Sequence, residues 1–167
     1  MNMIVAVDEK WAIGKNGGLL TPLPEDMKFF RKTTLDSVVI MGRKTLFSFP
    51  GNKPLKNRIN IIITKNRDFK TEDAAVVNTV EEAVKEAEKY DKPVFVIGGG
   101  SIYRQMLKYC DTAYITKIYK IFDDADTFID NLDKLGEWRI VEESEIKEYN
   151  GTKFRFLTYK KDRGALK

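Results

Sequence analysis

PVFVIGGGSIYRQM, residues 93–106, is the stretch of sequence that decides the fold. Residues 93–98 form a short, continuous apolar run, which suits a strand buried on both faces of a parallel sheet. Three glycines, residues 98–100, stand at the end of the run, and a helical segment is expected over residues 101–109. Glycines at such a turn let a ligand approach the backbone, and a helix N-terminus favours phosphate. The spacing is not the dinucleotide fingerprint, because Tyr103 occupies the place of the third glycine, so a merely permissive turn is the alternative interpretation.

Three further apolar runs and three further helical segments precede this stretch. The runs are MIVAV (3–7), SVVIMG (37–42) and INIIIT (59–64). The helical segments are about 24–34, a short one near 43–48, and TVEEAVKEAEKY (79–90). Thr79 and Glu82 have the spacing of a capping box, which supports the start of the last of these helices.

The pattern changes after Asp111, where TAYITKIYKI, EWRIVEESEIKE and TKFRFLTYKK alternate apolar and polar residues. The Asn-Gly pair in YNGT (149–152) is typical of a tight hairpin. We therefore expect one α/β domain over residues 1–160 and a basic C-terminal tail over 161–167. The domain is expected to hold a mixed, mostly parallel eight-stranded sheet, flanked by about four helices and finished by an antiparallel C-terminal hairpin.

The composition excludes several classes of chemistry. Cys110 is the only cysteine and the chain has no histidine, which excludes an intramolecular disulfide, a Cys–His nucleophile, histidine acid–base catalysis and the usual zinc sites. No metal site is expected. A lone cysteine suits a reducing compartment, the N-terminus lacks the features of a secretory signal, and no apolar run approaches the about 20 residues that cross a membrane. We therefore expect a cytoplasmic protein whose chemistry relies on carboxylate, hydroxyl, backbone or a bound cofactor.

Positively charged side chains come directly after two of the apolar runs, and a threonine hydroxyl accompanies one of these groups. Arg43, Lys44 and Thr45 come after the second run, and Lys65 and Arg67 come after the third. In open α/β sheets, ligands bind outside the carboxyl ends of the strands, so these clusters and the glycines predict an extended polyphosphate ligand across one sheet edge. Solvated surface charge is the alternative for each cluster taken separately. The net charge of +4 permits a nucleic acid as well as a small polyanion.

Residues 23–30, LPEDMKFF, are interpreted as the start of a helix and place two adjacent acids in different surroundings. Helix neighbours lie three and four residues apart, so Glu25 has Lys28 beside it, whereas Asp26 has only two phenylalanine rings. Acids favour the first helical turn, where they complement the macrodipole, and this is one explanation. The other is that Asp26 contacts a ligand.

KWAIGKNGGLLTPLP, residues 10–24, joins the first strand to this helix. Four glycines or prolines flank Leu19 and Leu20 within eight residues. Such a segment predicts a mobile lid, with an ordinary long loop as the alternative.

Six motifs run through nearly the whole chain in the order and spacing of one family. They are IVAVD…AIGKNGGL, LPEDMKFFRKTT, VVIMGRKT, IIIT, VIGGGSIYRQ and YITKI…DADTFI. On these motifs the sequence resembles the dihydrofolate reductase family, and the pair VIMGRKT and VIGGGSIY is specific for it. The resemblance implies NADPH-dependent reduction of dihydrofolate to tetrahydrofolate, in support of one-carbon metabolism. It also implies antifolate inhibitors as ligands, and we expect a monomer that binds neither nucleic acid nor membrane.

The resemblance assigns a pterin pocket by position. Asp26 matches the acid that hydrogen-bonds the pterin and assists protonation at N5, while hydride passes from nicotinamide to C6. Burial among apolar neighbours is expected to raise the pKa of this acid, a direction useful near neutral pH. Thr116 matches the threonine that hydrogen-bonds the acid, and Arg58 matches the arginine that binds the carboxylate of the glutamate tail. The other positions that match the folate pocket are Ile4, Val5, Met27, Phe30, Phe49, Leu55 and Ile97.

The resemblance also implies a cofactor site along the strand ends. Arg43 and Lys65 match residues that contact the 2′-phosphate, which implies NADPH rather than NADH. The Gly98–Gly99 peptide bond matches one that is cis in the family, a geometry that glycine at both positions permits. The positions that match cofactor contacts are Ala6, Ile13, Leu19, Gly42, Arg43, Lys44, Thr45, Thr64, Lys65, Gly99, Gly100, Ser101, Ile102, Tyr103 and Gln105.

Two departures from the family pattern concern the lid and the 2′-phosphate. Many members carry a Pro-Trp pair before the acidic helix, where this chain has Leu20 and Thr21. The tryptophan helps to organise a water near the pterin; Thr21 offers a hydroxyl but not the packing area of an indole. An arginine that is common after the glycines is replaced by Ser101, which weakens one expected phosphate contact.

Two other functions fit part of the pattern. Another reductase on the same fold, such as the reductase of riboflavin synthesis, would share the NADPH half and lack the pterin-pocket residues. A basic nucleic-acid-binding module would show a stripe of Lys and Arg with interleaved aromatic residues. Here the cations gather after strands and the acids are scattered, which favours the reductase of dihydrofolate.

Overall fold

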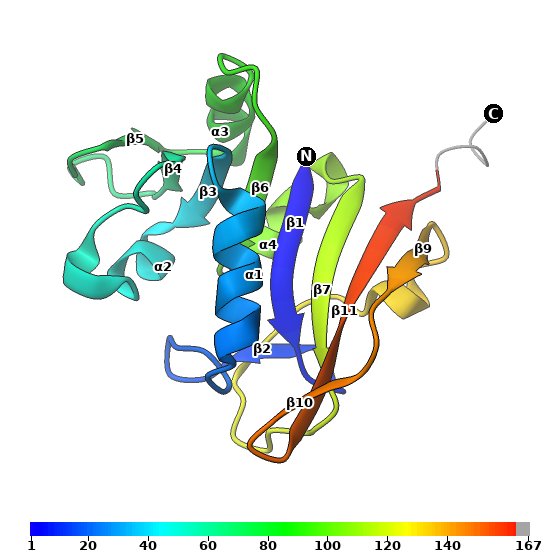
Figure 1. Cartoon of the computed structure of the whole chain (residues 1–167). Helices are drawn as coiled ribbons and strands as arrows, with labels where there is room; N and C mark the ends of the chain where they lie inside the picture. The colour runs from blue at the N-terminus through cyan, green and yellow to red at the C-terminus, as the bar shows by residue number, and fades with distance from the viewer. Residues whose placement is uncertain (163–167) are drawn as a thin grey trace.

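One mixed β-sheet forms the centre of the protein in the computed structural model, which describes residues 1–162 (Figure 1). Eight strands lie side by side in the order β10-β11-β7-β1-β6-β3-β4-β5. A ninth strand, β9, pairs with β11 on the same edge as β10, so the sheet has the eight strand positions expected from the sequence. The strands are β1 (Asn2–Val7), β3 (Val38–Gly42), β4 (Ile59–Ile63), β5 (Ala74–Val77), β6 (Val94–Gly98), β7 (Thr112–Ile118), β9 (Trp138–Glu143), β10 (Lys147–Tyr149) and β11 (Thr152–Lys161).

The pairing directions confirm a mostly parallel sheet with an antiparallel C-terminal hairpin. β1 lies between β6 and β7 and runs parallel to both, and β6, β3, β4 and β5 continue the parallel series. β11 runs antiparallel to β7 and forms the hairpin with β10. The hairpin turns at Asn150 and Gly151, whose φ angles of 48° and 81° are those that a tight type I′ turn requires.

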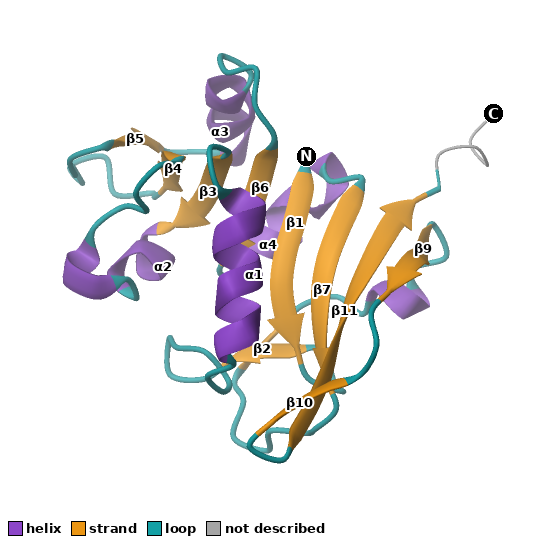
Figure 2. Ribbon diagram, in the orientation of Figure 1, coloured by secondary structure: helices purple, strands orange, loops and turns teal. Residues whose placement is uncertain are grey.

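Four α-helices flank the sheet, as expected (Figure 2). They are α1 (Pro24–Thr34), α2 (Arg43–Phe47), α3 (Val80–Ala87) and α4 (Gly100–Met106). The capping box at the start of α3 is present, because Thr79 Oγ1 accepts from the Glu82 N–H at 3.0 Å. The expected helices 79–90 and 101–109 end sooner, and α4 tightens into a 3₁₀ turn over Leu107–Tyr109, as helix ends often do. The other 3₁₀ turns are Pro50–Asn52 and Leu132–Lys134.

Both faces of the sheet are covered by helices, which explains the continuous apolar runs. Along β1, Met3 and Val7 belong to the larger hydrophobic cluster, which includes residues of α3 and α4. Ile4 belongs to a second cluster with Leu46 of α2, and Phe30 of α1 packs against it. Since neighbouring residues of a strand point to opposite faces, β1 separates two packed layers.

Three short strands were not predicted. β5 has four residues, all only partly buried, and β2 (Ala12–Gly14) and β8 (Thr127–Phe128) pair in a separate two-stranded sheet. Segments this short carry too few residues for a clear alternation of apolar and polar positions. Of the expected basic tail, Lys161 is the last residue of β11, and residues 163–167 lie outside the described residues. Within residues 1–162, no helix is long and apolar enough to cross a membrane.

Candidate functional site

A buried hydroxyl on β7 holds the carboxylate of Asp26 in the first turn of α1. Pro24 begins the helix, and the preceding Leu23 is buried, which fixes the start of α1 against the sheet. Thr116 is 2% exposed, and its Oγ1 donates to Asp26 Oδ1 at 2.5 Å. Thr116 lies opposite Ala6 in the β1–β7 register, so this pair lies near the carboxyl end of β1.

The surroundings of Asp26 favour its neutral form more than water does. Burial raises the pKa of Asp26 above its ordinary value, and the hydrogen bond from Thr116 opposes part of that rise. This confirms the direction expected from the sequence. No Lys or Arg of residues 1–162 forms an ion pair with Asp26, whereas its neighbour Glu25 pairs with Lys147 of β10 at 3.0 Å. The helix spacing predicted Lys28 as the neighbour of Glu25. The ion pair that Glu25 forms is instead with Lys147, which lies on β10 and is far away in sequence.

An apolar layer lies on the α1 side of the sheet and contains most of the predicted pterin-pocket residues. Ile4 and Ile97 are buried in it, and Phe30, Phe49 and Leu55 pack against it. These five positions, distant in sequence, therefore gather in one cluster.

Two of the predicted pocket residues lie outside this cluster. The side chain of Val5 packs against the larger cluster on the opposite face, because it alternates with Ile4 along β1. Met27 of α1 is 50% exposed. Their assignment to the pterin pocket stays a prediction.

Arg58 is oriented by backbone and hydroxyl acceptors at the C-terminal end of α1. Its guanidinium donates to Thr34 Oγ1 at 3.2 Å, to the Lys56 carbonyl at 2.7 Å and to the Arg31 carbonyl at 2.8 Å. The amide of buried Asn60 holds the preceding turn by bonding Leu55 N–H and carbonyl groups at 3.0 and 2.9 Å. Arg58 forms no ion pair within residues 1–162, so its charge is available to an anionic ligand.

The glycine turn after β6 is tightly packed on Tyr103. The Gly98–Gly99 peptide bond is cis, as expected, and Gly98 has a φ of 118°. A Cβ at Gly98 would lie 3.1 Å from the Tyr103 ring. The Tyr103 hydroxyl donates to the Ile4 carbonyl at 2.8 Å, and burial, with a smaller contribution from the charge of Asp26, raises the pKa of Tyr103. Tyr103 thus connects the glycine turn to Ile4 of β1, which belongs to the apolar layer.

The ends of β3 and β6 converge as the sequence predicted. A Cβ at Gly42 would lie 3.2 Å from Ile102 of α4, and a Cβ at Gly99 would lie 3.6 Å from Thr45 Oγ1 of α2. Gly100 opens α4 so close to β8 that its Cβ would lie 2.7 Å from a methyl group of Thr127. The backbone along this edge is therefore close to neighbouring elements.

The predicted cofactor residues with cationic side chains have few protein partners. The side chains of Arg43, Lys44 and Lys65 form no hydrogen bond or ion pair with another residue of 1–162. Thr64, in contrast, uses its polar groups within the protein: its N–H donates to the Val77 carbonyl at 3.0 Å and its Oγ1 accepts from a backbone N–H. The structure therefore leaves the cations, more than Thr64, available to an anion.

The remaining predicted cofactor residues are spread over three environments. Ser101 and Gln105 bond each other on α4, with Gln105 Nε2 donating to Ser101 Oγ at 2.8 Å. Ile13 packs against the larger cluster, and Ala6 packs against a third, smaller one. Leu19 is 68% exposed.

The predicted lid is docked on the loop between β7 and β8. Lys15 and Gly18 exchange two backbone hydrogen bonds around a tight turn, and the Asn16 N–H donates to Asp126 Oδ2 at 2.9 Å. Lys15 also forms an ion pair with Asp124. The sequence analysis did not single out these acids, because nothing in a run of aspartates shows which distant segment it contacts.

Buried Asp8 is a second residue that the sequence analysis missed. Its carboxylate accepts from the backbone N–H groups of Lys10 at 2.8 Å, Ala12 at 2.9 Å and Phe122 at 3.1 Å. It therefore ties the end of β1 to β2 and to the loop after β7. The only sequence signal was an acid that directly follows a buried strand.

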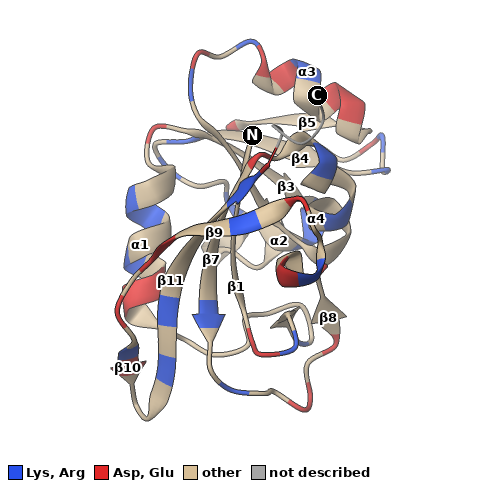
Figure 3. Ribbon diagram, turned by 90° about the vertical axis from the view of Figure 1, so that its right-hand side faces the viewer, with Lys and Arg blue, Asp and Glu red and all other residues tan. Residues whose placement is uncertain are grey.

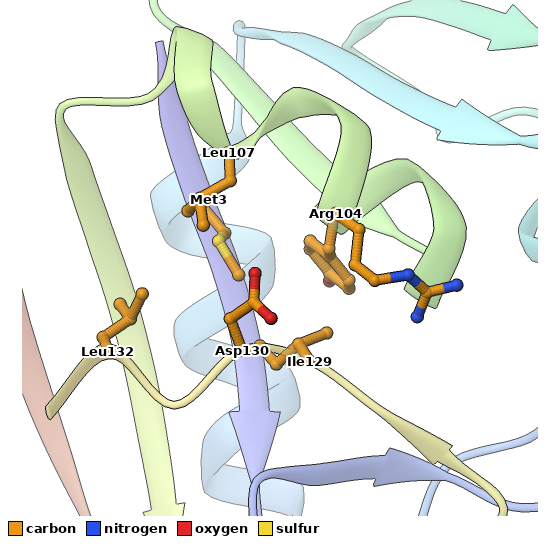
Figure 4. Close-up of a pocket in the computed structure, with 7 residues that line it drawn as sticks. Met3, Arg104, Leu107, Ile129, Asp130 and Leu132 are labelled. Atoms are coloured by element: carbon orange, nitrogen blue, oxygen red, sulfur yellow. The ribbon is translucent and has the colours of Figure 1, made fainter. Parts of the chain in front are cut away.

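Two hollows lie away from Asp26. One lies between β1, α4 and the segment after β8, is lined in part by Tyr103 and has no room for a water molecule; Figure 4 labels its other lining residues, Met3, Arg104, Leu107, Ile129, Asp130 and Leu132. The other measures about 250 Å³ and is lined by Phe29, Tyr114, Glu142, Glu143, Ser144, Phe156, Leu157 and Thr158. Neither of the two includes Asp26 or the glycine turn.

Comparison with known proteins agrees with this arrangement. The dihydrofolate reductase family matches the sequence over residues 1–161. The dihydrofolate reductase of Bacillus subtilis is 33% identical, covering 96% of this chain and 94% of its own, and that of Sus scrofa is 36% identical, covering 97% and 98%. The structure of dihydrofolate reductase from Enterococcus faecalis complexed with NADP(H) and RAB-propyl matches with a TM-score of 0.84 at 34% identity, covering 96% of this chain and 95% of that one. The chain therefore belongs to the dihydrofolate reductase family.

Proposed function

We propose that this protein reduces dihydrofolate to tetrahydrofolate with NADPH, and that Asp26 assists the protonation of the pterin ring at N5. The chain is an NADPH-dependent oxidoreductase of the dihydrofolate reductase family. The observation that carries the residue assignment is the Asp26–Thr116 pair, together with the apolar layer whose Ile4 is connected through Tyr103 to the glycine turn.

Asp26 and Arg58 orient the two polar ends of the substrate in this proposal. The Asp26 carboxyl hydrogen-bonds the pterin, while the guanidinium of Arg58 binds a carboxylate of the glutamate tail. The two residues lie toward opposite ends of α1, since Arg58 bonds the Arg31 carbonyl in its last turn. Ile4, Phe30 and Leu55 cover the apolar part between them and exclude water.

The raised pKa of Asp26 supports its part in proton transfer. A carboxyl that keeps its proton closer to neutral pH can hydrogen-bond the pterin and supply a proton when charge develops at N5. The hydrogen bond from Thr116 fixes the orientation of the carboxyl and keeps the pKa from rising further. The chain has no histidine that could share this role.

The residues along the strand ends fit the cofactor. The glycine turn has no side chain between its backbone and a ligand, and the side chains of Arg43, Lys44 and Lys65 form no ion pair within residues 1–162. In the proposal, Arg43 and Lys65 bind the 2′-phosphate and the backbone of Gly99–Ser101 contacts the pyrophosphate. When bound, NADPH supplies the hydride for pterin C6. The protein orients the two rings and excludes water.

A reductase of riboflavin synthesis on the same fold is the second candidate. It shares the cofactor residues, and the pterin-pocket arrangement of Asp26, Thr116 and Arg58 argues against it. A nucleic-acid-binding module receives no support, because Figure 3 shows Lys and Arg interspersed with Asp and Glu over the described residues.

Oxidation of NADPH in the presence of dihydrofolate tests the proposal. We expect rapid loss of NADPH absorbance with dihydrofolate, slower loss with NADH in its place, and none without the pterin. Absence of oxidation with NADPH still bound would refute the substrate and leave the cofactor assignment.

Three further properties belong to the same proposal. We infer a monomer. The buried free thiol of Cys110, the one cysteine of the sequence, suits a cytoplasmic enzyme. Antifolates that mimic the pterin should compete with dihydrofolate at Asp26.

A further inference from the structure

Two phenylalanine rings hold the guanidinium of Arg43 at the end of β3. The Arg43 Cζ atom lies 5.7 Å from the centre of the Phe47 ring and 5.8 Å from the centre of the Phe69 ring. The two ring centres are 5.9 Å apart, with an angle of 68° between the ring planes. A guanidinium within about 6 Å of an aromatic face is in the range of a cation–π interaction.

The backbone fixes both rings independently of Arg43. Phe47 is four residues after Arg43 in α2, so their side chains lie on the same face of the helix. Phe69 ends a compact turn after β4, in which the Asn66 N–H donates to Thr64 Oγ1 at 3.1 Å and the Phe69 N–H donates to the Asn66 carbonyl at 3.2 Å. Lys65 belongs to the same turn, so one local structure places both a phenyl ring and a second cation.

The exposure of Phe47 is not explained by packing of the core. Phe47 is 47% exposed, whereas its helix neighbour Leu46 is fully buried. A large apolar side chain in that position loses little contact with water on folding. Its close approach to Arg43 and to Phe69 is the contact that the structure gives it.

The aromatic contacts leave the donors of Arg43 free. The side chain of Arg43 forms no hydrogen bond or ion pair with another residue of 1–162. Ring faces attract the guanidinium without accepting its N–H groups, and a planar guanidinium binds a phosphate through two parallel hydrogen bonds. The rings therefore restrict the side chain and keep its donors available to an anion.

We propose that Phe47 and Phe69 are positioning residues that determine the preference for NADPH over NADH, because they hold Arg43 ready for the 2′-phosphate. This inference rests on the proposed function, in which Arg43 binds that phosphate. The rings restrict the rotamers of Arg43 before the ligand arrives, so less conformational entropy is lost on binding.

Leucine substitutions at the two rings test the inference. Dissociation constants for NADPH, NADH, adenosine 2′,5′-bisphosphate and 5′-AMP are measured for wild type, Phe47→Leu, Phe69→Leu and the double variant. We expect each single variant to bind NADPH and the bisphosphate about two- to five-fold more weakly, the size of an exposed cation–π contact. Binding of NADH and 5′-AMP should stay unchanged. Phe47→Trp, which keeps an aromatic face, should retain the NADPH preference.

A matched control and a stability measurement separate this role from a structural one. Tyr149→Leu removes an exposed aromatic residue on β10 and should leave all four constants unchanged. Urea unfolding identifies any variant that loses its fold. If NADPH and NADH weaken equally, the rings contact a shared part of the cofactor, and the inference is wrong. If wild type itself binds NADPH and NADH equally, the assignment of Arg43 fails; if wild type prefers NADPH and the leucine variants keep that preference, only the role of the rings fails.

Discussion

Replacement of Asp26 by asparagine tests whether this carboxyl handles the proton in catalysis. Asparagine is close in size, and its Oδ1 can accept the Thr116 hydrogen bond that is 2.5 Å long in the wild type, so the local packing is retained. Asparagine cannot donate a proton to N5. We expect turnover at neutral pH to fall about 10²- to 10⁴-fold, the usual contribution of a general acid or base. This range corresponds to about 2.7–5.4 kcal/mol of activation free energy, at about 1.36 kcal/mol for each factor of ten.

The pH dependence of turnover should change in the same variant. Burial raises the pKa of Asp26, so the fraction of protonated carboxyl in the wild type falls as pH rises through that raised value. Turnover of the wild type should fall with it. In Asp26→Asn this step is absent, and protonation from solvent should make turnover increase continuously as pH decreases.

At neutral pH, Asp26→Asn should raise the free energy of unfolding although it lowers turnover. The folded protein holds the Asp26 proton more tightly than the unfolded chain, because the folded pKa is raised above the ordinary value of 3.8. The resulting stabilisation is complete below the unfolded pKa and is lost as pH rises through the folded pKa. At neutral pH the buried charge therefore destabilises the wild type, and Asp26→Asn should have the larger free energy of unfolding. The difference should disappear in acid.

Two assays and one control variant test the role of Asp26 in proton transfer. NADPH oxidation is followed from acidic to basic pH, and urea unfolding is measured at the same pH values. Glu25→Gln is the matched control, because it removes the adjacent acid and its contact with Lys147 and should leave turnover unchanged. Unchanged turnover in Asp26→Asn, or an equal loss in Glu25→Gln, would refute the reasoning.

Three other substitutions test separate parts of the site. Thr116→Val removes the hydrogen bond that lowers the pKa of Asp26, so the fall in the pH–rate profile should move to higher pH; an unmoved profile would contradict this. Gly98→Ala forces a Cβ to within 3.1 Å of Tyr103 at a φ of 118° and should lower the free energy of unfolding in urea by about 1–3 kcal/mol, whereas an equally stable variant would rule out this strain. Arg58→Ala should raise KM for dihydrofolate about 10- to 100-fold and leave a pterin without the glutamate tail unaffected; equal losses for both would refute its role.

Strand positions were predictable from the sequence because burial on both faces produces unbroken β-branched runs. The order of the strands was not, since the run at 3–7 lies between β6 and β7, which are far away in the chain. Composition gave no means to decide that order. The short strands β2, β5 and β8 lacked a pattern because each has four residues or fewer.

The candidate site was predictable where one residue type stood out locally. Asp26 was identified by its apolar helix neighbours, and the glycine turn by its place after a buried run. Partners that lie far away in sequence carried no local signal: Thr116 lies 90 residues from Asp26 and was assigned through the resemblance alone. The exposed ring of Phe47 was missed for a similar reason, because only the fold brings Phe69 beside it.

The central strand of the sheet is synthesised first and paired late. β1 ends at Val7, but its two neighbours end at Gly98 and Ile118, so both of its edges stay open on the ribosome until much of the chain has emerged. Closing such long loops loses chain entropy before the contacts form, which slows folding of sheets with distant pairing. Asp26 meets Thr116 only when β7 has joined the sheet. A nascent chain that stops before this strand therefore has the acidic helix without its partner, and catalytic competence arrives as one of the last events of folding.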